Sequence, residues 1–339
     1  MSRASRRGLL TLASLAALAA AAALLSFKTG PVPISWGELA RVVADPGARE
    51  TLPAPSRILL DLRLPRVLLG LLVGAALAVS GTTFQALLRN PLADPYLLGL
   101  SGGAALGAVL VLVTGVTASA PLLLPAAAVA GALAAVVAVW RLAAGAGALP
   151  PNSLILAGVV VSSFCSALVM FLASVSPAGR VQGALYWLMG SLASPPRGVL
   201  APVAVAVIAG TAALSLAGSR LNALSLGEET AAHLGVDVPR TRALLFFAAS
   251  LVTGAAVAAA GLVGFVGLVV PHALRTLVGA DHRLLLPASA LAGAAVLALA
   301  DTAARSILPP AEVPVGVVTA LFGAPFFLVL LRRRRGWMG

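Results

Sequence analysis

The sequence carries very little charge for its length. Of its 339 residues, 10% are charged and 60% are hydrophobic, whereas a soluble domain has about 25% charged residues. The mean hydropathy is +1.03. Because so few charged side chains cannot cover a water-exposed surface, the composition excludes an ordinary soluble protein and indicates a membrane protein.

Cysteine and lysine are each present once. With Cys165 as the single cysteine, an intrachain disulfide and a cysteine-based metal cluster are excluded. With Lys28 as the single lysine, the Gly-x-x-x-x-Gly-Lys loop that binds nucleotide phosphates is excluded as well. His233, His272 and His282 show no metal-ligand spacing. We therefore predict no metal, no cofactor and no catalytic residue, so another polypeptide must supply the energy if transport is uphill.

Acidic residues are almost absent from the apolar stretches, where ion-coupled carriers usually place carboxylates or histidines. The net charge of +12 does not indicate nucleic-acid binding. The basic residues lie between apolar runs rather than on one basic and aromatic face. Loops between membrane-spanning helices account for them better, with lipid as the surrounding medium.

Charge-free windows predict the membrane spans, since about 20 apolar residues cross a bilayer core. Single spans are predicted at 9–27, 67–88, 152–174, 198–219, 284–300 and 313–331. The window 95–140 is long enough for two helices, with a turn between Thr114 and Pro121. The window 243–274 fits either one very long helix or two short ones, broken near Gly261, Gly264 and Gly267.

Arginine clusters decide between nine and ten spans. One cluster precedes the first span (Arg3, Arg6 and Arg7) and one follows the last (Arg332–Arg335). Basic flanks prefer the cytoplasm, so both termini are predicted inside, which requires an even number. We predict an all-α, polytopic protein of the cell (inner) membrane, with ten transmembrane helices in a single domain, 1–339. The alternative for residues 1–27 is a cleaved signal peptide, given the basic start and alanine-rich run.

An internal echo predicts an inverted repeat. The stretch Gly74–Gly81 is similar to Gly254–Gly261, and Ala93-Asp94 precedes a Leu-Leu pair as Ala280-Asp281 does. The related halves are about 67–180 and 243–331. The first pair of matches falls in spans that cross in opposite directions, as in the repeats that build transport pathways. The alternative is that helices rich in glycine and alanine resemble each other by composition.

The one substantial inside insert, 220–242, predicts a short cytoplasmic helix. Ser225 and Glu228 have the spacing of a capping box, Glu229 complements the helix dipole, and Gly235 is a natural C-terminal stop. Such a strongly capped helix favours a docking element for a soluble partner over a plain loop.

The outside segment 28–66 breaks the positive-inside pattern. Arg63 and Arg66 abut the membrane on the unfavoured side. Arg305 lies just beyond the outer end of the ninth span, four residues after Asp301, and is expected to pair with it in part. These arginines are either interfacial anchors with their charged groups in water or a positive docking surface.

Several long motifs in one order carry a family resemblance. They are Leu62–Arg66, Asn90–Tyr96, Gly264–His272, Ala280–Arg283, Leu299–Asp301 with Arg305, and Pro314–Ala320 with Gly323–Pro325. In these stretches the chain resembles the permease subunits of ABC importers for iron chelates, haem and cobalamin. The resemblance covers nearly all of the chain beyond the first helix.

The resemblance implies an assembly of a second copy of this chain, two ATP-binding subunits inside and a substrate-binding protein outside. It implies that the binding protein docks on Arg63, Arg66 and Arg305. It implies that an ATPase-coupling helix, Leu226–Gly235, involves Ser225, Leu226, Gly227, Glu228, Glu229, His233 and Gly235. It places a pathway and cytoplasmic gate at Pro151, Asn152, Ser153, Ser162, Ser166, Gly316 and Thr319.

The predicted pathway lining is small, neutral and weakly polar. Such a lining suits a bulky chelate whose metal is already shielded, whereas a bare cation would need oxygen or thiolate ligands. Ferric siderophore, haem and cobalamin remain open. The alternative function is an ion-coupled secondary transporter or channel with inverted repeats, which would need a buried ionisable relay and would leave 220–242 unexplained.

Overall fold

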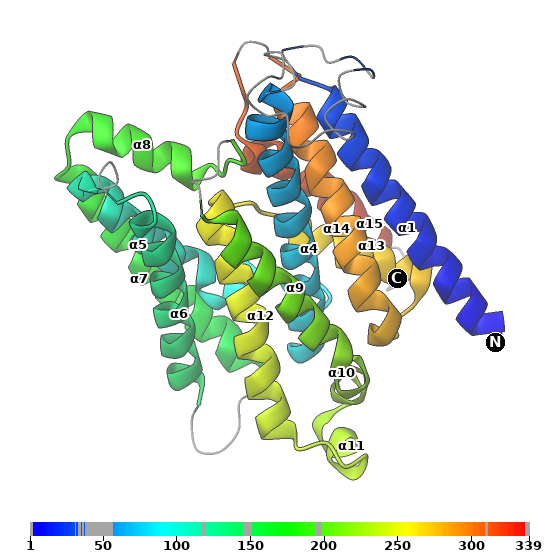
Figure 1. The fold of residues 1–339 in the computed structure, drawn as a ribbon. Helices are drawn as coiled ribbons and strands as arrows, with labels where there is room; N and C mark the ends of the chain where they lie inside the picture. Colours follow the sequence, from blue (N-terminus) through cyan, green and yellow to red (C-terminus); the bar gives the residue numbers. More distant parts are fainter. Residues whose placement is uncertain are drawn as a thin grey trace.

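The computed structural model describes residues 3–30, 32, 35, 37, 57–116, 120–144, 151–193, 198–308 and 311–335, and these form helices and connecting turns. Figure 1 shows the helices as one elongated bundle, with the N-terminus at the same end as α10 and α11. Residues 38–56 of the predicted outside segment lie outside the described part of the chain.

Among the residues that the structure describes, six helices are long and apolar enough to cross a membrane. They are α1 (Arg3–Lys28, apolar over Arg6–Lys28), α4 (Leu64–Leu87, continuous with a π-helical turn at Leu59–Arg63), α6 (Leu123–Ala143), α7 (Pro151–Ser174), α12 (Val238–Ala260) and α14 (His282–Ala304). A further candidate is the pair α9 (Leu200–Leu216) and α10 (Gly218–Ser225), bent by 55°. Three shorter apolar helices are α5 (Leu100–Thr114), α13 (Val266–Val278) and the apolar part of α15 (Val315–Arg335).

Both ambiguous windows contain two helices. The window 95–140 divides into α5 and α6, and the predicted turn after Thr114 is confirmed. The window 243–274 divides into α12 and α13, with a break at 261–265 where Gly261 and Phe265 have positive φ angles of 69° and 67°. The two-helix interpretation of each window is therefore confirmed, whereas the total of ten spans and the inverted repeat remain predictions.

Two short elements were not predicted from the sequence: the 3-10 turn Pro95–Leu98, which precedes α5, and α8 (Ala178–Leu188), which follows α7. The short helix that was predicted in 220–242 is present as α11 and comprises only Glu228–His233. Figure 1 shows α8 across the upper end of the bundle, above α5 and α7. Arg180 on α8 donates to the carbonyl oxygen of Val113 at 2.5 Å. An arginine within so short a stretch kept α8 out of the apolar windows.

Glycine pairs allow the central helices to cross at very short range. A Cβ added to Gly74 of α4 would lie 2.2 Å from the carbonyl oxygen of Gly293 on α14, and the reverse distance is 2.3 Å. Gly103 of α5 and Gly131 of α6 meet in the same reciprocal way. Small residues permit such backbone contact in lipid, where packing rather than the hydrophobic effect holds helices together.

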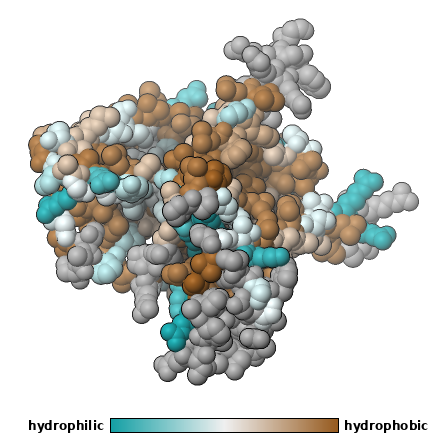
Figure 2. Space-filling model, turned by 90° about the horizontal axis from the view of Figure 1, so that it is seen from above, coloured by the Kyte–Doolittle hydropathy of each residue, from teal (hydrophilic) through white to brown (hydrophobic). Residues whose placement is uncertain are grey.

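The surface of the bundle is largely apolar. In the view from above, hydrophobic residues (brown) cover most of the described surface, with hydrophilic residues (teal) in scattered places (Figure 2). The exposed large side chains include Phe164 and Met170 on α7, and Leu321 and Phe322 on α15. Such a surface suits lipid or an apolar partner.

Candidate functional site

Arg63, Arg66 and Arg305, the arginines predicted to face outward, lie at one end of the bundle. The C-terminal ends of α1 and α14 and the start of α4 meet there. Arg66 donates from Nε and one terminal nitrogen to Asp301, with Nε 3.0 and 2.9 Å from the two carboxylate oxygens. Its other terminal nitrogen donates to both oxygens of Glu312, at 3.1 and 2.9 Å. Arg66 is therefore shared by a carboxylate on α14 and one in the segment that precedes α15.

Arg63 and Arg305 hold the C-terminal end of α1. Arg63 donates to the carbonyl oxygens of Phe27 at 2.7 Å, Lys28 at 3.2 Å, and Val32. Arg305 donates to the hydroxyl of Ser26 at 2.6 Å and to its carbonyl oxygen. These guanidiniums satisfy carbonyl groups that a helix end leaves without partners in the helix.

The burial of Arg63 and Arg305 shows whether they can be interfacial anchors with their charged groups in water. Arg63 is 5% exposed and Arg305 is 3% exposed. The alternative that all three are interfacial anchors with charged groups in water is therefore wrong for these two. The expected pairing of Arg305 with Asp301 is confirmed, with Nε 3.6 Å from the carboxylate. Arg63, Arg66, Arg305, Asp301 and Glu312 together form the outer arginine cluster. Its most exposed part is the pair of Arg66 and Glu312, because 39% of the Glu312 side chain is exposed.

At the end of the bundle predicted to face the cytoplasm, called the inner end below, α10 and α11 form the segment that was predicted to be cytoplasmic. The capping box is wrong, because Ser225 is the last residue of α10 and donates its hydroxyl to the carbonyl oxygen of Leu221 at 2.8 Å. The N-cap of α11 is instead Gly227, whose φ of 123° is accessible mainly to glycine. The helix therefore runs over Glu228–His233 rather than over Leu226–Gly235.

The predicted stop at Gly235 is confirmed. Gly235 has a φ of 80°, and its N–H donates to the carbonyl oxygen of Ala232 at 2.9 Å. The next N–H, of Val236, donates to Ala231 at 3.0 Å. This pair of hydrogen bonds is a Schellman motif, and it turns the chain back toward α12.

Glu228 ties the inner segment to the bundle. Its carboxylate accepts from Arg242 of α12 at 2.6 Å and from Arg89, just after α4, at 3.2 Å. Glu228 is 45% exposed. Leu226, Glu229, His233 and Leu234 are also exposed, including two large apolar side chains that no described element covers. The segment therefore presents a mixed apolar and acidic face to the inner side.

A polar cavity of about 430 Å³ lies between α10, the end of α4 and the start of α14. Asn222 of α10 donates to the Asp281 carboxylate at 2.7 Å and accepts from the backbone N–H of His282 at 2.8 Å. This donation from Asn222 holds the pKa of Asp281 below its usual range. The contacts couple the inner segment to the first residues of α14.

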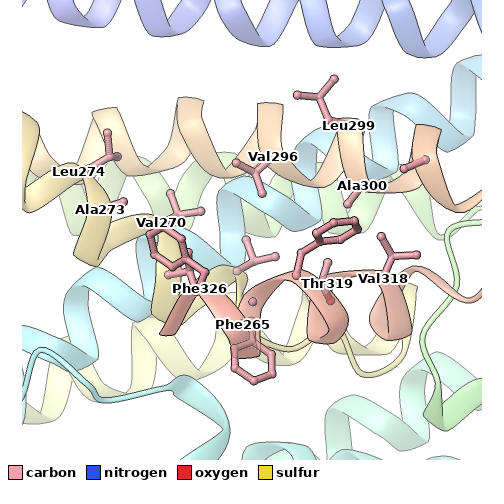
Figure 3. Close-up of a pocket in the computed structure, with 15 residues that line it drawn as sticks. Phe265, Val270, Ala273, Leu274, Val296, Leu299, Ala300, Val318, Thr319 and Phe326 are labelled. Carbon is pink, nitrogen blue, oxygen red and sulfur yellow. The ribbon is translucent and has the colours of Figure 1, made fainter. Parts of the chain in front are cut away.

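The predicted pathway residues do not line one common cavity. Ser162 and Ser166 line a cavity of about 390 Å³ between α5, α7 and α8. Gly316 lines another, of about 520 Å³, beside the end of α8. Thr319 lines an apolar cavity of about 500 Å³ between α13, α14 and α15 (Figure 3), and its hydroxyl donates to the carbonyl oxygen of Gly316. Pro151, Asn152 and Ser153 form the first turn of α7.

Three backbone segments approach each other closely beside these cavities. A Cβ at Gly316 would be 2.4 Å from the carbonyl oxygen of Met189 and 2.5 Å from that of Leu262. The hydroxyl of Tyr96 donates to the carbonyl oxygen of Val263 and accepts from its N–H, both at 3.0 Å. The end of α8, the break before α13 and the start of α15 are thus packed together, which sequence reasoning did not predict.

The comparisons with known proteins point to one class of protein, the permeases of transport systems. The model of the FecCD transport family matches residues 18–333. The chain is 47% identical to the cobalamin import system permease protein BtuC of Halobacterium salinarum, over 80% of this chain and 73% of that protein. It is 46% identical to the hemin transport system permease protein HmuU of Yersinia pestis, over 82% of this chain and 84% of that protein.

A solved structure agrees over almost the whole length. It is described as an inward-facing conformation of a transporter of the metal-chelate ABC type. The TM-score is 0.83 at 33% sequence identity, and the match covers 96% of this chain and 99% of that chain. The fold is therefore shared over nearly all of both chains.

Proposed function

Because the chain belongs to the FecCD transport family, we propose that it is the permease subunit of an ATP-driven importer for a metal chelate. The single observation that carries this function is the family match over residues 18–333, which leaves only the two ends uncovered. The imported molecule is the substrate, and this subunit provides its passage from a binding protein to the cytoplasm.

The substrate class follows from the relatives and from the cavities. Two relatives import cobalamin and hemin by name, and both molecules hold their metal inside an organic ring. The cavity next to Thr319 is lined almost entirely by apolar side chains, including Phe265, Phe322 and Phe326 (Figure 3). A bare cation would find no oxygen or thiolate set there. Ferric siderophore, haem and cobalamin are the candidate substrates.

Two ATP-binding subunits would dock at the inner end. The support is the exposed face of α10 and α11, where Leu226 is 69% exposed and Glu229 lies in the first turn of α11. We infer that Leu226 and Leu234, which is 63% exposed, together face the ATP-binding subunit. Hydrolysis in the partners would then move α10 and, through Asn222, the start of α14.

A second copy of the chain would complete the pathway. α7 and α15 carry the predicted pathway residues, and both expose large apolar side chains such as Phe164 and Leu321. The smaller positions on these helices, Ser162 and Gly316, lie among them. We infer that these helices face the partner copy and that the substrate passes between the two subunits.

The topology would comprise ten spans with both termini in the cytoplasm. The support is the sum of six long apolar helices, one bent pair and three shorter apolar helices. Reporter fusions after residues 140, 230 and 310 should read inside, inside and outside. An inside signal at 310 would reject this arrangement, because α14 then could not cross from the inner to the outer end.

Co-purification tests the function itself. The permease is expressed with the ATP-binding subunits and the binding protein of its host, and an affinity tag is placed on the permease. We expect the ATP-binding subunit to be retained and its ATPase activity to rise when the loaded binding protein is added. If the tagged permease is recovered folded but without an ATP-binding subunit, the chain is an ion-coupled carrier or channel instead.

A further inference from the structure

The outer arginine cluster has more positive than negative charge. Its described contacts join three guanidiniums, those of Arg63, Arg66 and Arg305, to the two carboxylates of Asp301 and Glu312. The cluster thus has an excess of one positive charge, 3 minus 2. An additional carboxylate from outside would complement it.

The two carboxylates are held very differently. Asp301 is 3% exposed and lies between Arg66 and Arg305. Glu312 is 39% exposed, and it accepts hydrogen bonds from a single terminal nitrogen of Arg66. Removing one partner of a buried ion pair is strongly unfavourable, whereas breaking an exposed pair costs little. The replaceable partner of Arg66 is therefore Glu312.

Glu312 lies at the entrance to α15. That helix begins at Val315, only three residues later. The adjoining residue, Val313, donates its N–H to the carbonyl oxygen of Ala304 at the end of α14, at 3.0 Å. The contact between Arg66 and Glu312 thus fixes the connection from α14 to α15 against the start of α4.

We propose that Glu312 competes intramolecularly for Arg66 with a carboxylate of the binding protein. This rests on the proposed function. On docking, the partner's carboxylate takes the terminal nitrogen of Arg66 that Glu312 occupies and accepts charge-assisted hydrogen bonds from it, while Nε and the other terminal nitrogen stay on Asp301. Glu312 is released to water, and the segment before α15 loses its tether to α4. Docking outside is thereby transmitted to the helix that carries Gly316 and Thr319.

The competition predicts an unusual sign for one substitution. Glu312→Gln removes a negative charge and the competitor together, so the binding protein should associate more tightly. An exposed pair contributes up to about 1 kcal/mol, which corresponds to a gain of up to about fivefold in affinity. Asp61→Asn is the matched control, since Asp61 is an exposed carboxylate in the turn before α4. It changes the charge at the same end equally but leaves the contact of Arg66 with Glu312 in place.

The experiment measures association and dissociation of the host's purified binding protein on the complete importer in nanodiscs. We expect Glu312→Gln to tighten binding about two- to fivefold, and Asp61→Asn to change it less. A spin label on Ala311→Cys, in a background with Cys165→Ala, should become mobile when the binding protein docks. With Glu312→Gln it should be mobile beforehand. Equal or weaker binding by the Glu312 variant, or a label that docking does not affect, would overturn the proposal.

A second variant separates this proposal from the function on which it rests. Arg66→Met removes the group for which both carboxylates compete, and correct assembly is checked by retention of the ATP-binding subunit. If the assembled Arg66 variant binds the binding protein as well as wild type does, docking on this cluster is wrong and the competition is wrong with it. If Arg66→Met weakens binding while Glu312→Gln does not strengthen it, docking stands and only the competition is rejected.

Discussion

At the end of the bundle predicted to face outward (the outer end), Arg66 and Arg305 contact Asp301, whose side chain is 3% exposed. At the end predicted to face the cytoplasm (the inner end), Arg89 and Arg242 share Glu228, whose side chain is 45% exposed. The outer carboxylate joins helices that are far apart in the sequence and lies among buried arginines. The inner one fastens a six-residue helix to the bundle from the water side. The same pair of residue types therefore joins buried helices at one end and holds an exposed short helix at the other.

The difference follows from the surroundings of the charges. When a buried ion pair loses one partner, the other charge stays buried without water to solvate it, which is strongly unfavourable. An exposed carboxylate exchanges its partner for water at little cost. We expect substitutions at the outer end to lower the stability of the fold strongly. Substitutions at the inner end should lower stability less but should reduce transport.

The largest effect should come from Asp301→Ala. The substitution leaves Arg66 and Arg305 buried with one carboxylate fewer, and loss of one partner of a buried ion pair costs about 3–5 kcal/mol. Thermal unfolding in detergent and the yield of folded protein measure this. Asp237→Asn is the control, because Asp237 forms an exposed pair with Arg240 at 3.3 Å. Equal stability of the two variants would contradict the contrast between the ends.

An intermediate effect is expected at the break before α13. Tyr96→Phe leaves both the N–H and the carbonyl oxygen of Val263 without the hydroxyl that they share. An unsatisfied buried polar group costs about 1–3 kcal/mol. Tyr186→Phe serves as the control, since Tyr186 is 58% exposed. If both variants unfold at the wild-type temperature, the Tyr96 hydroxyl does not hold the break before α13.

Glu228→Gln should separate stability from function. Glu228 pairs with the half-exposed Arg89 and with the buried Arg242, so its loss should lower the free energy of unfolding by less than the about 3–5 kcal/mol expected for Asp301→Ala. Uptake should nevertheless fall several-fold, because α11 loses its contacts with Arg89 and Arg242. Unfolding and ATP-dependent uptake are measured on the same preparation. A variant that transports at the wild-type rate would make α11 an ordinary loop.

The smallest effect is expected for Ser225→Ala. The hydroxyl of Ser225 donates within α10 to Leu221 rather than capping α11, so the change in unfolding free energy should stay within about 0.5 kcal/mol. A loss of 1 kcal/mol or more would restore the capping interpretation. Gly227→Ala provides the comparison, because its φ of 123° strains any other residue.

The sequence was a good guide wherever apolar length decides the structure. The windows around α1, α4, α6, α7, α9, α12, α14 and α15 predicted helices because a lipid core requires long uncharged stretches. Gly235 could be predicted as a stop, since glycine readily takes the positive φ of a helix end.

Other features depend on distant contacts that no local pattern encodes. Arg66 and Asp301 are 235 residues apart, so their pairing could not be predicted from either neighbourhood. The capping box failed because Gly227, between the two capping residues, takes a conformation that starts α11 without a side-chain cap. A usable signal existed for Glu312, because Asp301 and Glu312 are the two acidic residues between the last two predicted spans.

Uptake into proteoliposomes tests the central claim most directly. The permease is reconstituted with its ATP-binding subunits, the binding protein is placed on the outer side, and ATP is supplied on the inner side. We predict that a ferric siderophore, haem or cobalamin accumulates only when ATP and the binding protein are both present. Accumulation by the permease alone, driven by a proton or sodium gradient without ATP, would contradict the account.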